Sequence, residues 1–155
     1  MEIVRARNEF MDSIMEIERE CFSIPWSENS IRFELASADA IFPVAVEDGQ
    51  VLGFGILHKI GDEGELFNLV VSEERRGEGI GAALLDAALL QAKGMGVEKV
   101  YLEVRRSNTP ARKLYESRGF AVCGMRKNYY EEPREDAMLM DLELQSADMG
   151  VEMRE

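Results

Sequence analysis

The chain has 155 residues, with 18 lysines and arginines against 30 aspartates and glutamates, and a formal net charge of −12. Hydrophobic residues make up 46% of it, enough to bury the core of one domain, which excludes a wholly disordered chain. The negative charge argues against broad binding to nucleic acids or anionic membranes, and we expect neither as a partner. Much of this charge falls in residues 131–155. The preceding part can therefore still form a local cationic site.

The cysteines and the histidine give no sign of a metal centre. Cys21 and Cys123 are far apart and match no zinc spacing, and His58 is the single histidine. The N-terminal residues lack the apolar segment of a secretion signal, and no apolar run approaches the roughly 18 residues of a membrane span. We expect a soluble protein of the reducing cytoplasm that uses no metal.

Residues 1–144 are expected to form a single domain, because no repeat, low-complexity segment or linker divides them. Residues 145–155 are polar and acidic and are expected to be a flexible tail. At the start of the chain, alternation predicts a short strand over residues 3–7. Apolar residues at helical spacing then predict helices over residues 9–22 and 28–36, the second capped by a serine.

The middle of the chain predicts a hairpin, a further strand and a buried helix. Two β-rich runs, residues 41–46 and 51–57, flank an Asp-Gly pair, which is a strong two-residue hairpin signal. Another strand is expected over residues 66–71. Residues 80–93 are apolar on nearly every side and end at glycines, which predicts a buried helix.

The last third adds three strands and one helix. Residues 99–104 alternate, and Thr109 followed by proline predicts a capped helix that reaches Arg118. Two final strands are expected over residues 120–124 and 137–144. The order β-α-α-β-β-β-α-β-α-β-β predicts an α/β (α+β) fold, a mixed central sheet with helices on both faces.

Residues 75–82, Arg-Arg-Gly-Glu-Gly-Ile-Gly-Ala, lead from an expected strand into an expected helix. Glycines allow the backbone to approach an oxyanion, and the free N–H groups and dipole of a helix start favour negative charge. Gly-x-Gly alone is typical of any tight helix start. Following a strand and two arginines, it favours phosphate binding. The glycine spacing does not match a dinucleotide site, and no Gly-Lys-Ser/Thr follows as in a nucleotide hydrolase.

The Arg-x-x-Gly-x-Gly loop resembles that of the GNAT superfamily of acetyl-CoA-dependent N-acetyltransferases. Three other blocks resemble, more narrowly, the bacterial ribosomal-protein-alanine N-acetyltransferases: Phe22-Ser23-Ile24-Pro25-Trp26-Ser27, Leu102-Glu103-Val104-Arg105-Arg106-Ser107-Asn108, and Asn128-Tyr129-Tyr130. The resemblance covers residues 2 to about 144 and implies the GNAT fold, with acetyl-CoA as the cosubstrate. The implied partner is a protein N-terminus, that of a small-subunit ribosomal protein.

The resemblance also implies where the coenzyme binds. The pantetheine arm would lie between two splayed strands and bond the main chain of residues 69–71, and the loop would hold the pyrophosphate. Asn108 would contact the coenzyme beyond the second strand, although it also suits a turn before the Thr109 cap. The implied coenzyme-binding residues are Leu69, Val70, Val71, Arg76, Gly77, Glu78, Gly79, Ile80, Gly81, Ala82 and Asn108.

Two residues carry the implied catalysis. Glu103 resembles the general base of the family, which takes a proton from the attacking amine, and Tyr115 the general acid, which protonates the departing sulfur. From composition alone, Glu103 suits a solvated strand residue, but its apolar neighbours Leu102 and Val104 favour a cleft over open water. Tyr115 suits a core tyrosine equally well. Direct transfer needs no acyl-enzyme, and neither cysteine has a motif that would activate it.

Trp26, Tyr129 and Tyr130 are the candidate acceptor-binding residues, because aromatic side chains in connecting segments are costly unless they pack or bind. Core packing explains Trp26 equally well. Three alternatives remain open at this point: transfer to other protein N-termini or to a small-molecule amine, a coenzyme-binding module without turnover, and a subunit whose acceptor site a partner chain completes.

Overall fold

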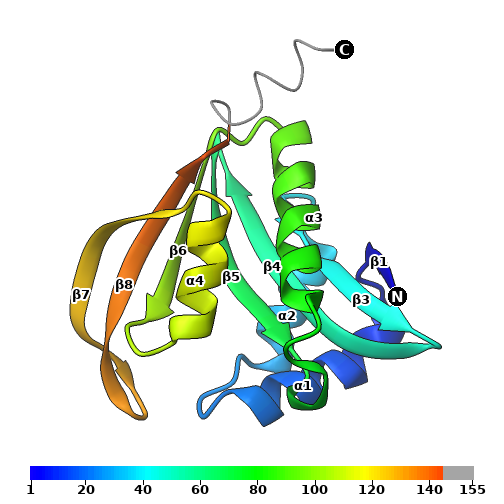
Figure 1. The fold of residues 1–155 in the computed structure, drawn as a ribbon. Coiled ribbons are helices and arrows are strands. Elements are labelled where there is room, and N and C mark those ends of the chain that lie inside the picture. The colour runs from blue at the N-terminus through cyan, green and yellow to red at the C-terminus, as the bar shows by residue number, and fades with distance from the viewer. Residues whose placement is uncertain (145–155) are drawn as a thin grey trace.

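The computed structural model describes residues 1–144, so the expected tail lies outside the described residues. One mixed sheet runs through the molecule in the order β1-β3-β4-β5-β6-β8-β7, with β2 paired to β4 (Figure 1). The strands are β1 (Glu2–Arg5), β2 (Ala40–Ile41), β3 (Pro43–Glu47), β4 (Gln50–Ile60), β5 (Glu63–Val71), β6 (Lys99–Arg105), β7 (Ala121–Glu131) and β8 (Arg134–Glu143). The helices are η1 (Asn8–Phe10), α1 (Met11–Cys21), α2 (Glu28–Ala36), η2 (Glu73–Arg75), α3 (Ile80–Gly94) and α4 (Thr109–Ser117).

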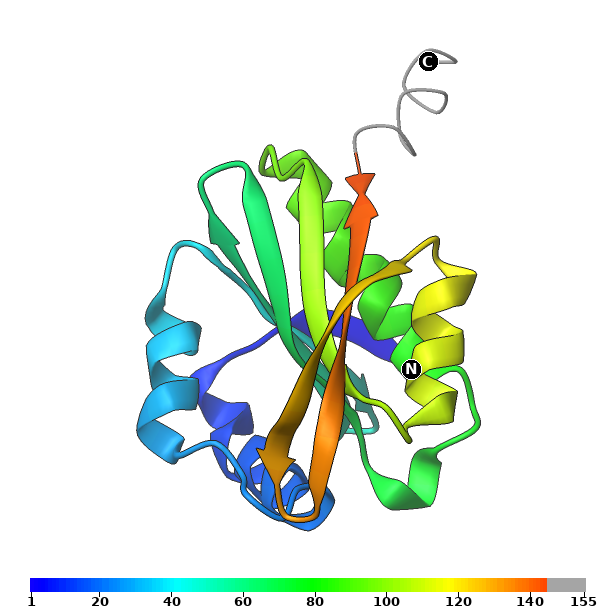
Figure 2. The ribbon, with the colours of Figure 1, turned by 90° about the vertical axis from the view of Figure 1, so that its left-hand side faces the viewer.

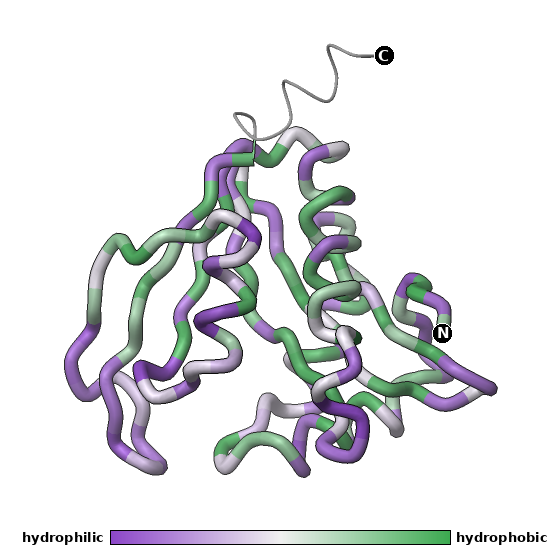
Figure 3. Tube along the Cα trace, viewed as in Figure 1, coloured by the Kyte–Doolittle hydropathy of each residue, from purple (hydrophilic) through white to green (hydrophobic). Residues whose placement is uncertain are grey.

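The helices cover both faces of the sheet. Figures 1 and 2 show α1 and α2 on one face and α3 and α4 on the other. Each face has its own apolar core: Ile14 and Ile31 pack with Phe54 on the first, and Leu85 packs with Leu102 on the second. Hydrophobic residues follow α3 and the central strands in Figure 3, and hydrophilic residues gather at the turns. The expected mixed sheet with helices on both faces is confirmed.

Local signals account for most of the element boundaries. The Ser27 hydroxyl accepts a hydrogen bond from the backbone N–H of Ser30 and so caps α2, which begins and ends as expected. The Asp48-Gly49 turn has positive φ at both residues, 51° and 78°, as a tight hairpin requires. None of the described helices is both long and apolar enough to cross a membrane.

Several expected elements have other bounds in the structure: η1 precedes α1, β4 and β5 are longer than the expected 51–57 and 66–71, and β8 begins before residue 137. Three further differences concern one helix cap and two strands. Asn108, not Thr109, caps α4: its side-chain oxygen accepts from the N–H of Ala111. The strand expected over residues 41–46 is divided into β2 and β3. The strand expected to end at residue 124 continues to Glu131, so that Tyr129 and Tyr130 lie in β7 and not in a connecting segment. Antiparallel pairing with β8 supports this longer strand and resumes at Tyr130 after a register shift that begins at Arg126.

The strands β5 and β6 separate partway along their length. They are the parallel pair of the sheet, and their pairing runs from Glu63↔Lys99 to Leu66↔Leu102. Beyond that point β5 continues to Val71 and β6 to Arg105 without pairing to each other. The register between β4 and β5 also shifts there and leaves Phe67 without a partner, a β-bulge that bends β5. The result is an opening in the centre of the sheet.

Candidate active site

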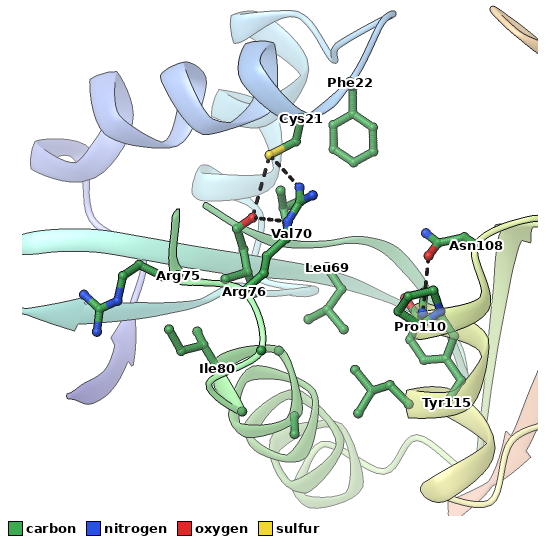
Figure 4. A pocket seen from close by; sticks show the side chains of 17 residues that line it. Cys21, Phe22, Leu69, Val70, Arg75, Arg76, Ile80, Asn108, Pro110 and Tyr115 are labelled. Carbon is green, nitrogen blue, oxygen red and sulfur yellow. Dashed lines mark hydrogen bonds between the residues drawn. The ribbon is translucent and has the colours of Figure 1, made fainter. Parts of the chain in front are cut away.

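A cavity of about 540 Å³ lies where β5 and β6 separate, between the start of α3 and the start of α4 (Figure 4). Its lining contains ten of the eleven expected coenzyme-binding residues, namely Leu69, Val70, Val71, Arg76, Gly77, Gly79, Ile80, Gly81, Ala82 and Asn108. Tyr115 also lines it. Glu78 is the exception, because its carboxylate instead accepts hydrogen bonds from Arg75. The structure therefore brings nearly all of the expected coenzyme-binding residues, together with Tyr115, to one place.

The floor of this cavity has the geometry of an anion site. Gly77 and Gly79 have φ of +81° and +84°, the left-handed conformation that favours glycine, and no side chain fills the space at either position. Gly79 is the N-cap of α3, so the unpaired N–H groups of the first turn and the positive end of the helix dipole lie beside the cavity. This arrangement suits a phosphate group.

The two arginines of the loop have different surroundings. Arg75 donates to Glu78 and forms an ion pair of 2.9 Å with Glu47, and its side chain points away from Tyr115 in Figure 4. Its charge is therefore compensated by carboxylates. Arg76 donates instead to the carbonyl of Val71 and to the Cys21 sulfur, each at 3.2 Å, so its guanidinium meets no carboxylate in these two contacts.

Tyr115 is a buried phenol at the inner end of the cavity. Its side chain belongs to the core beneath α3 and α4, its ring meets the edge of Phe120 at 5.7 Å, and only 8% of the residue is exposed. Burial raises the pKa of Tyr115 well above its usual range, and the neighbouring Tyr130 adds to this. The hydroxyl therefore keeps its proton to higher pH than an exposed tyrosine does.

Glu103 lies in β6 on the other face of the sheet. Its neighbours Leu102 and Val104 point into the core beneath α3 and α4, and because side chains alternate along a strand, Glu103 faces the side of α1 and α2. It does not line the cavity that contains Tyr115. Its Oε2 is buried and accepts no hydrogen bond among the described residues, and Arg126 Nε lies 3.5 Å from it.

The two expected tyrosines of β7 are neighbours of Glu103. Their rings meet edge to face at 5.2 Å, and the Arg105 guanidinium lies 4.3 Å from the ring centre of Tyr130. Burial, and then the charge of Glu103, raise the pKa of Tyr130 to about 12. Tyr130 in turn contributes to the raised pKa of Tyr115, so its ring lies within electrostatic range of both Glu103 and Tyr115.

Trp26 lies in the connection between α1 and α2, residues 22–27. Its ring contacts Phe67, the bulged residue of β5, at 5.5 Å between ring centres, and it packs against the core beneath α1. Trp26 is therefore partly core, and its part in acceptor binding stays a prediction.

Sequence reasoning missed five residues that line the cavity, Cys21, Phe22, Pro110, Ala111 and Leu114. Pro110, Ala111 and Leu114 belong to the α4 segment whose helical stripe the sequence shows, so their position could have been found from the expected placement of Tyr115. Cys21 and Phe22 end α1 far away in the sequence, and only the tertiary fold places them here. No sequence pattern indicated that Arg126 would pair with Glu103.

The site therefore combines an anion-binding helix start, an opening between two strands, a protonated phenol on one side and a carboxylate on the other. Such a set can bind a phosphate-containing ligand whose arm enters the sheet, and can give and take protons at its tip.

Comparison with known proteins agrees with this geometry. The profile of the "Acetyltransferase (GNAT) family" matches residues 11–120. The [ribosomal protein bS18]-alanine N-acetyltransferase of Haemophilus influenzae is 36% identical over 132 residues, which span 83% of this chain and 89% of the relative. The crystal structure of the ribosomal-protein-S18-alanine N-acetyltransferase from Escherichia coli has a TM-score of 0.85 at 32% identity, with 92% of this chain and 93% of that one covered. Ard1 from Thermoplasma volcanium also has a TM-score of 0.85, at 26% identity over 92% of this chain and 96% of its own.

Proposed function

Since this chain belongs to the acetyltransferase (GNAT) family and is an acetyl-CoA-dependent N-acetyltransferase, we propose that its acceptor is the N-terminal alanine of a small-subunit ribosomal protein. The acceptor rests on the relatives, whose names specify alanine of ribosomal protein bS18. We place the reaction in the cytoplasm, where ribosomal proteins are made.

The observation that carries the catalytic proposal is the opening between β5 and β6, with Tyr115 on one face of the sheet and Glu103 on the other. The start of α3 holds the coenzyme pyrophosphate, with Arg76 beside it. The pantetheine arm then extends along residues 69–71, and the thioester reaches the opening. An acceptor that approaches from the side of α1 and α2 meets it next to Glu103.

Proton accounting assigns the two side chains their roles. The neutral amine attacks the thioester carbonyl carbon, and Glu103 takes the amine proton, directly or through a water molecule. A backbone N–H of residues 69–71 stabilises the tetrahedral oxyanion. The carbon–sulfur bond then breaks, and Tyr115 gives its proton to the sulfur, so that the products are the acetylated amine and free coenzyme A. Both side chains return to their starting states by exchange with solvent.

An α-amine suits this site better than lysine. With a pKa of about 7.7 to 8.0, about a tenth to a fifth of α-amine molecules are neutral at pH 7, against about one lysine in a few thousand. The difference corresponds to about 3.5 kcal/mol of deprotonation that the site does not have to supply.

A peptide panel tests the proposed acceptor. Transfer from labelled acetyl-CoA is measured for peptides that begin with Ala, Ser, Met or Gly and for Nα-blocked lysine peptides, with the site of acetylation read by mass spectrometry. We expect the alanine peptide with the N-terminal sequence of the ribosomal protein to be the best acceptor and the blocked peptides to be inert. Preference for a blocked lysine peptide or a small amine contradicts the proposal, and absence of any transfer favours a module that needs a partner chain.

A further inference from the structure

Glu18 is a buried carboxylate that the proposed chemistry does not use. It lies on the inward face of α1, next to Ile14 and Ile17, and only 1% of it is exposed. Burial raises the pKa of Glu18, as expected for a charge removed from water. A carboxylate is costly in such a place unless its oxygens are hydrogen-bonded.

Both oxygens of Glu18 have partners, and the partners come from two other segments. Oε2 accepts a hydrogen bond from the backbone N–H of Trp26 at 3.0 Å. Oε1 accepts one from the side-chain Nδ2 of Asn68 at 2.9 Å. Trp26 belongs to the connection between α1 and α2, and Asn68 to β5, so a single carboxylate joins α1, this connection and the strand.

The hydrogen bond between Glu18 and Asn68 bears on the site because of where Asn68 lies in β5. Asn68 follows the bulged Phe67 and precedes residues 69–71, along which we place the pantetheine arm. Phe67 holds the ring of Trp26 from the same strand. At its other end, the connection reaches the β7–β8 turn, where the Ser23 hydroxyl donates to the carbonyl of Glu132. The connection therefore spans from the coenzyme strand to the hairpin that carries the two tyrosines.

A carboxylate is the group that this arrangement needs, because two donors point at it. An ionised carboxylate only accepts, so it satisfies both without rearrangement. An apolar side chain of similar size fills the same space but leaves the Trp26 N–H and the Asn68 amide unpaired. The connection then loses its attachment to β5 at the backbone of Trp26 while the packing of α1 stays intact.

We propose that Glu18 is a positioning residue for the acceptor: it fixes residues 22–27 against β5 and so shapes the wall along which the acceptor N-terminus lies. The inference rests on the proposed transfer to a protein N-terminus. Glu18 acts through Trp26 and Asn68 and not on the reacting atoms. Its loss should therefore weaken binding of the acceptor more than binding of the coenzyme.

The test compares Glu18→Met, which keeps the volume and removes both acceptors, with Glu18→Gln, which retains one acceptor and can donate to a rotated Asn68 amide. Glu34→Gln is the matched control: Glu34 is also a buried carboxylate, 5% exposed, but it lies on α2 and bonds His58 at 2.7 Å. For each variant, KM is measured separately for the acceptor peptide and for acetyl-CoA. Trp26 is the single tryptophan, so the emission of the protein reports directly on residues 22–27.

In Glu18→Met we expect the peptide KM to rise about tenfold, the effect of roughly one lost hydrogen bond, with the acetyl-CoA KM nearly unchanged. Trp26 emission should shift to the red and become easier to quench with acrylamide. Glu18→Gln should restore most of both properties, and Glu34→Gln should change neither. If Glu18→Met does not fold, Asn68→Ala removes the hydrogen bond from the side of β5. It should also raise the peptide KM without changing the acetyl-CoA KM, by a smaller factor.

Unchanged peptide KM and unchanged Trp26 emission in Glu18→Met overturn the inference, as does an equal rise of both KM values. The inference and the proposed function fail in different ways. A wrong acceptor shows in the wild-type peptide panel, whereas the Glu18 comparison is made with whichever amine the wild type acetylates.

Discussion

Arg126 Nε lies 3.5 Å from Oε2 of Glu103, an oxygen that accepts no hydrogen bond among the described residues. The side chain of Arg126 is 60% exposed and that of Glu103 is 23% exposed, so the arginine can move away while the carboxylate stays in place. We infer that the guanidinium lies where an acceptor amine must approach. The free hydrogen-bonding capacity of this oxygen suits the proposed role of Glu103 as general base.

Glu103→Gln should lower kcat by about 10²- to 10⁴-fold, because the amide keeps the shape of the carboxylate but cannot take the amine proton. Acetyl-CoA affinity, measured by calorimetry, should stay nearly the same. Glu63→Gln is the control, since Glu63 lies at the start of β5, away from the opening, and accepts from the Tyr101 hydroxyl. A wild-type rate in Glu103→Gln rules out the base, and loss of coenzyme binding assigns Glu103 a structural role.

Tyr115→Phe should lower kcat strongly without changing the melting temperature, because the ring keeps its contact with Phe120 and only the hydroxyl is lost. The loss should be smaller with an acyl donor whose thiol is a better leaving group, since that thiolate departs without a proton. Tyr101→Phe, which removes a hydroxyl on β6 outside the cavity, serves as the control. An equal loss with both donors means that the hydroxyl orients the coenzyme and does not donate a proton.

The rate of transfer should not fall at high pH through deprotonation of Tyr115. Burial raises the pKa of Tyr115, so its proton is lost only as pH rises through this elevated value. The rate with an α-amine acceptor should therefore rise to about pH 9, where most of an amine with a pKa of about 7.7 to 8.0 is neutral, and stay level to about pH 10. A fall between about pH 9 and 10, where an unperturbed tyrosine titrates, that disappears in Tyr115→Phe contradicts the assignment.

Gly79→Val should weaken acetyl-CoA binding. The glycine caps α3 beside the cavity, and a side chain there occupies space that the coenzyme phosphates need. Its φ of +84° means that any substitution also strains the backbone, by about 1 to 2 kcal/mol. Gly96→Val separates the two effects, because Gly96 has a φ of +85° beyond the far end of α3. Both variants should lose similar stability, and equal coenzyme affinity in the two contradicts the phosphate site.

Local patterns predicted the parts of the fold that depend on local chemistry. The Asp48-Gly49 hairpin, the Ser27 cap and the apolar helix after the glycine loop follow from residues a few positions apart. The predicted cap of α4 was wrong. Asn108 and Thr109 are both good capping residues, and the choice between them depends on the residue at which the backbone becomes helical after β6. The length of β7 depends on its pairing with β8, which no local pattern encodes.

The glycine loop could be found from the sequence because its chemistry lies in one short stretch. For the proposed acceptor side the sequence named candidate residues but not their arrangement, since residues 22–27, β6 and β7 come together only in the tertiary fold. Alternation showed that Glu103 faces away from its neighbours but not that Arg126 would meet it. Glu18 fits a helical stripe of otherwise apolar residues, and its purpose is visible only when Trp26 and Asn68 are placed against it.

The most direct test of the central claim is a crystal structure with a bisubstrate analogue, in which coenzyme A is joined through an acetyl group to the α-amine of an alanine peptide. We predict that its pyrophosphate binds at the start of α3, with the sulfur near the Tyr115 hydroxyl and the amine nitrogen near Glu103, directly or through one water. The peptide should leave between residues 22–27 and the tyrosines of β7. A complex in which the sulfur and the nitrogen lie on the same side of the sheet, away from either Tyr115 or Glu103, contradicts the account.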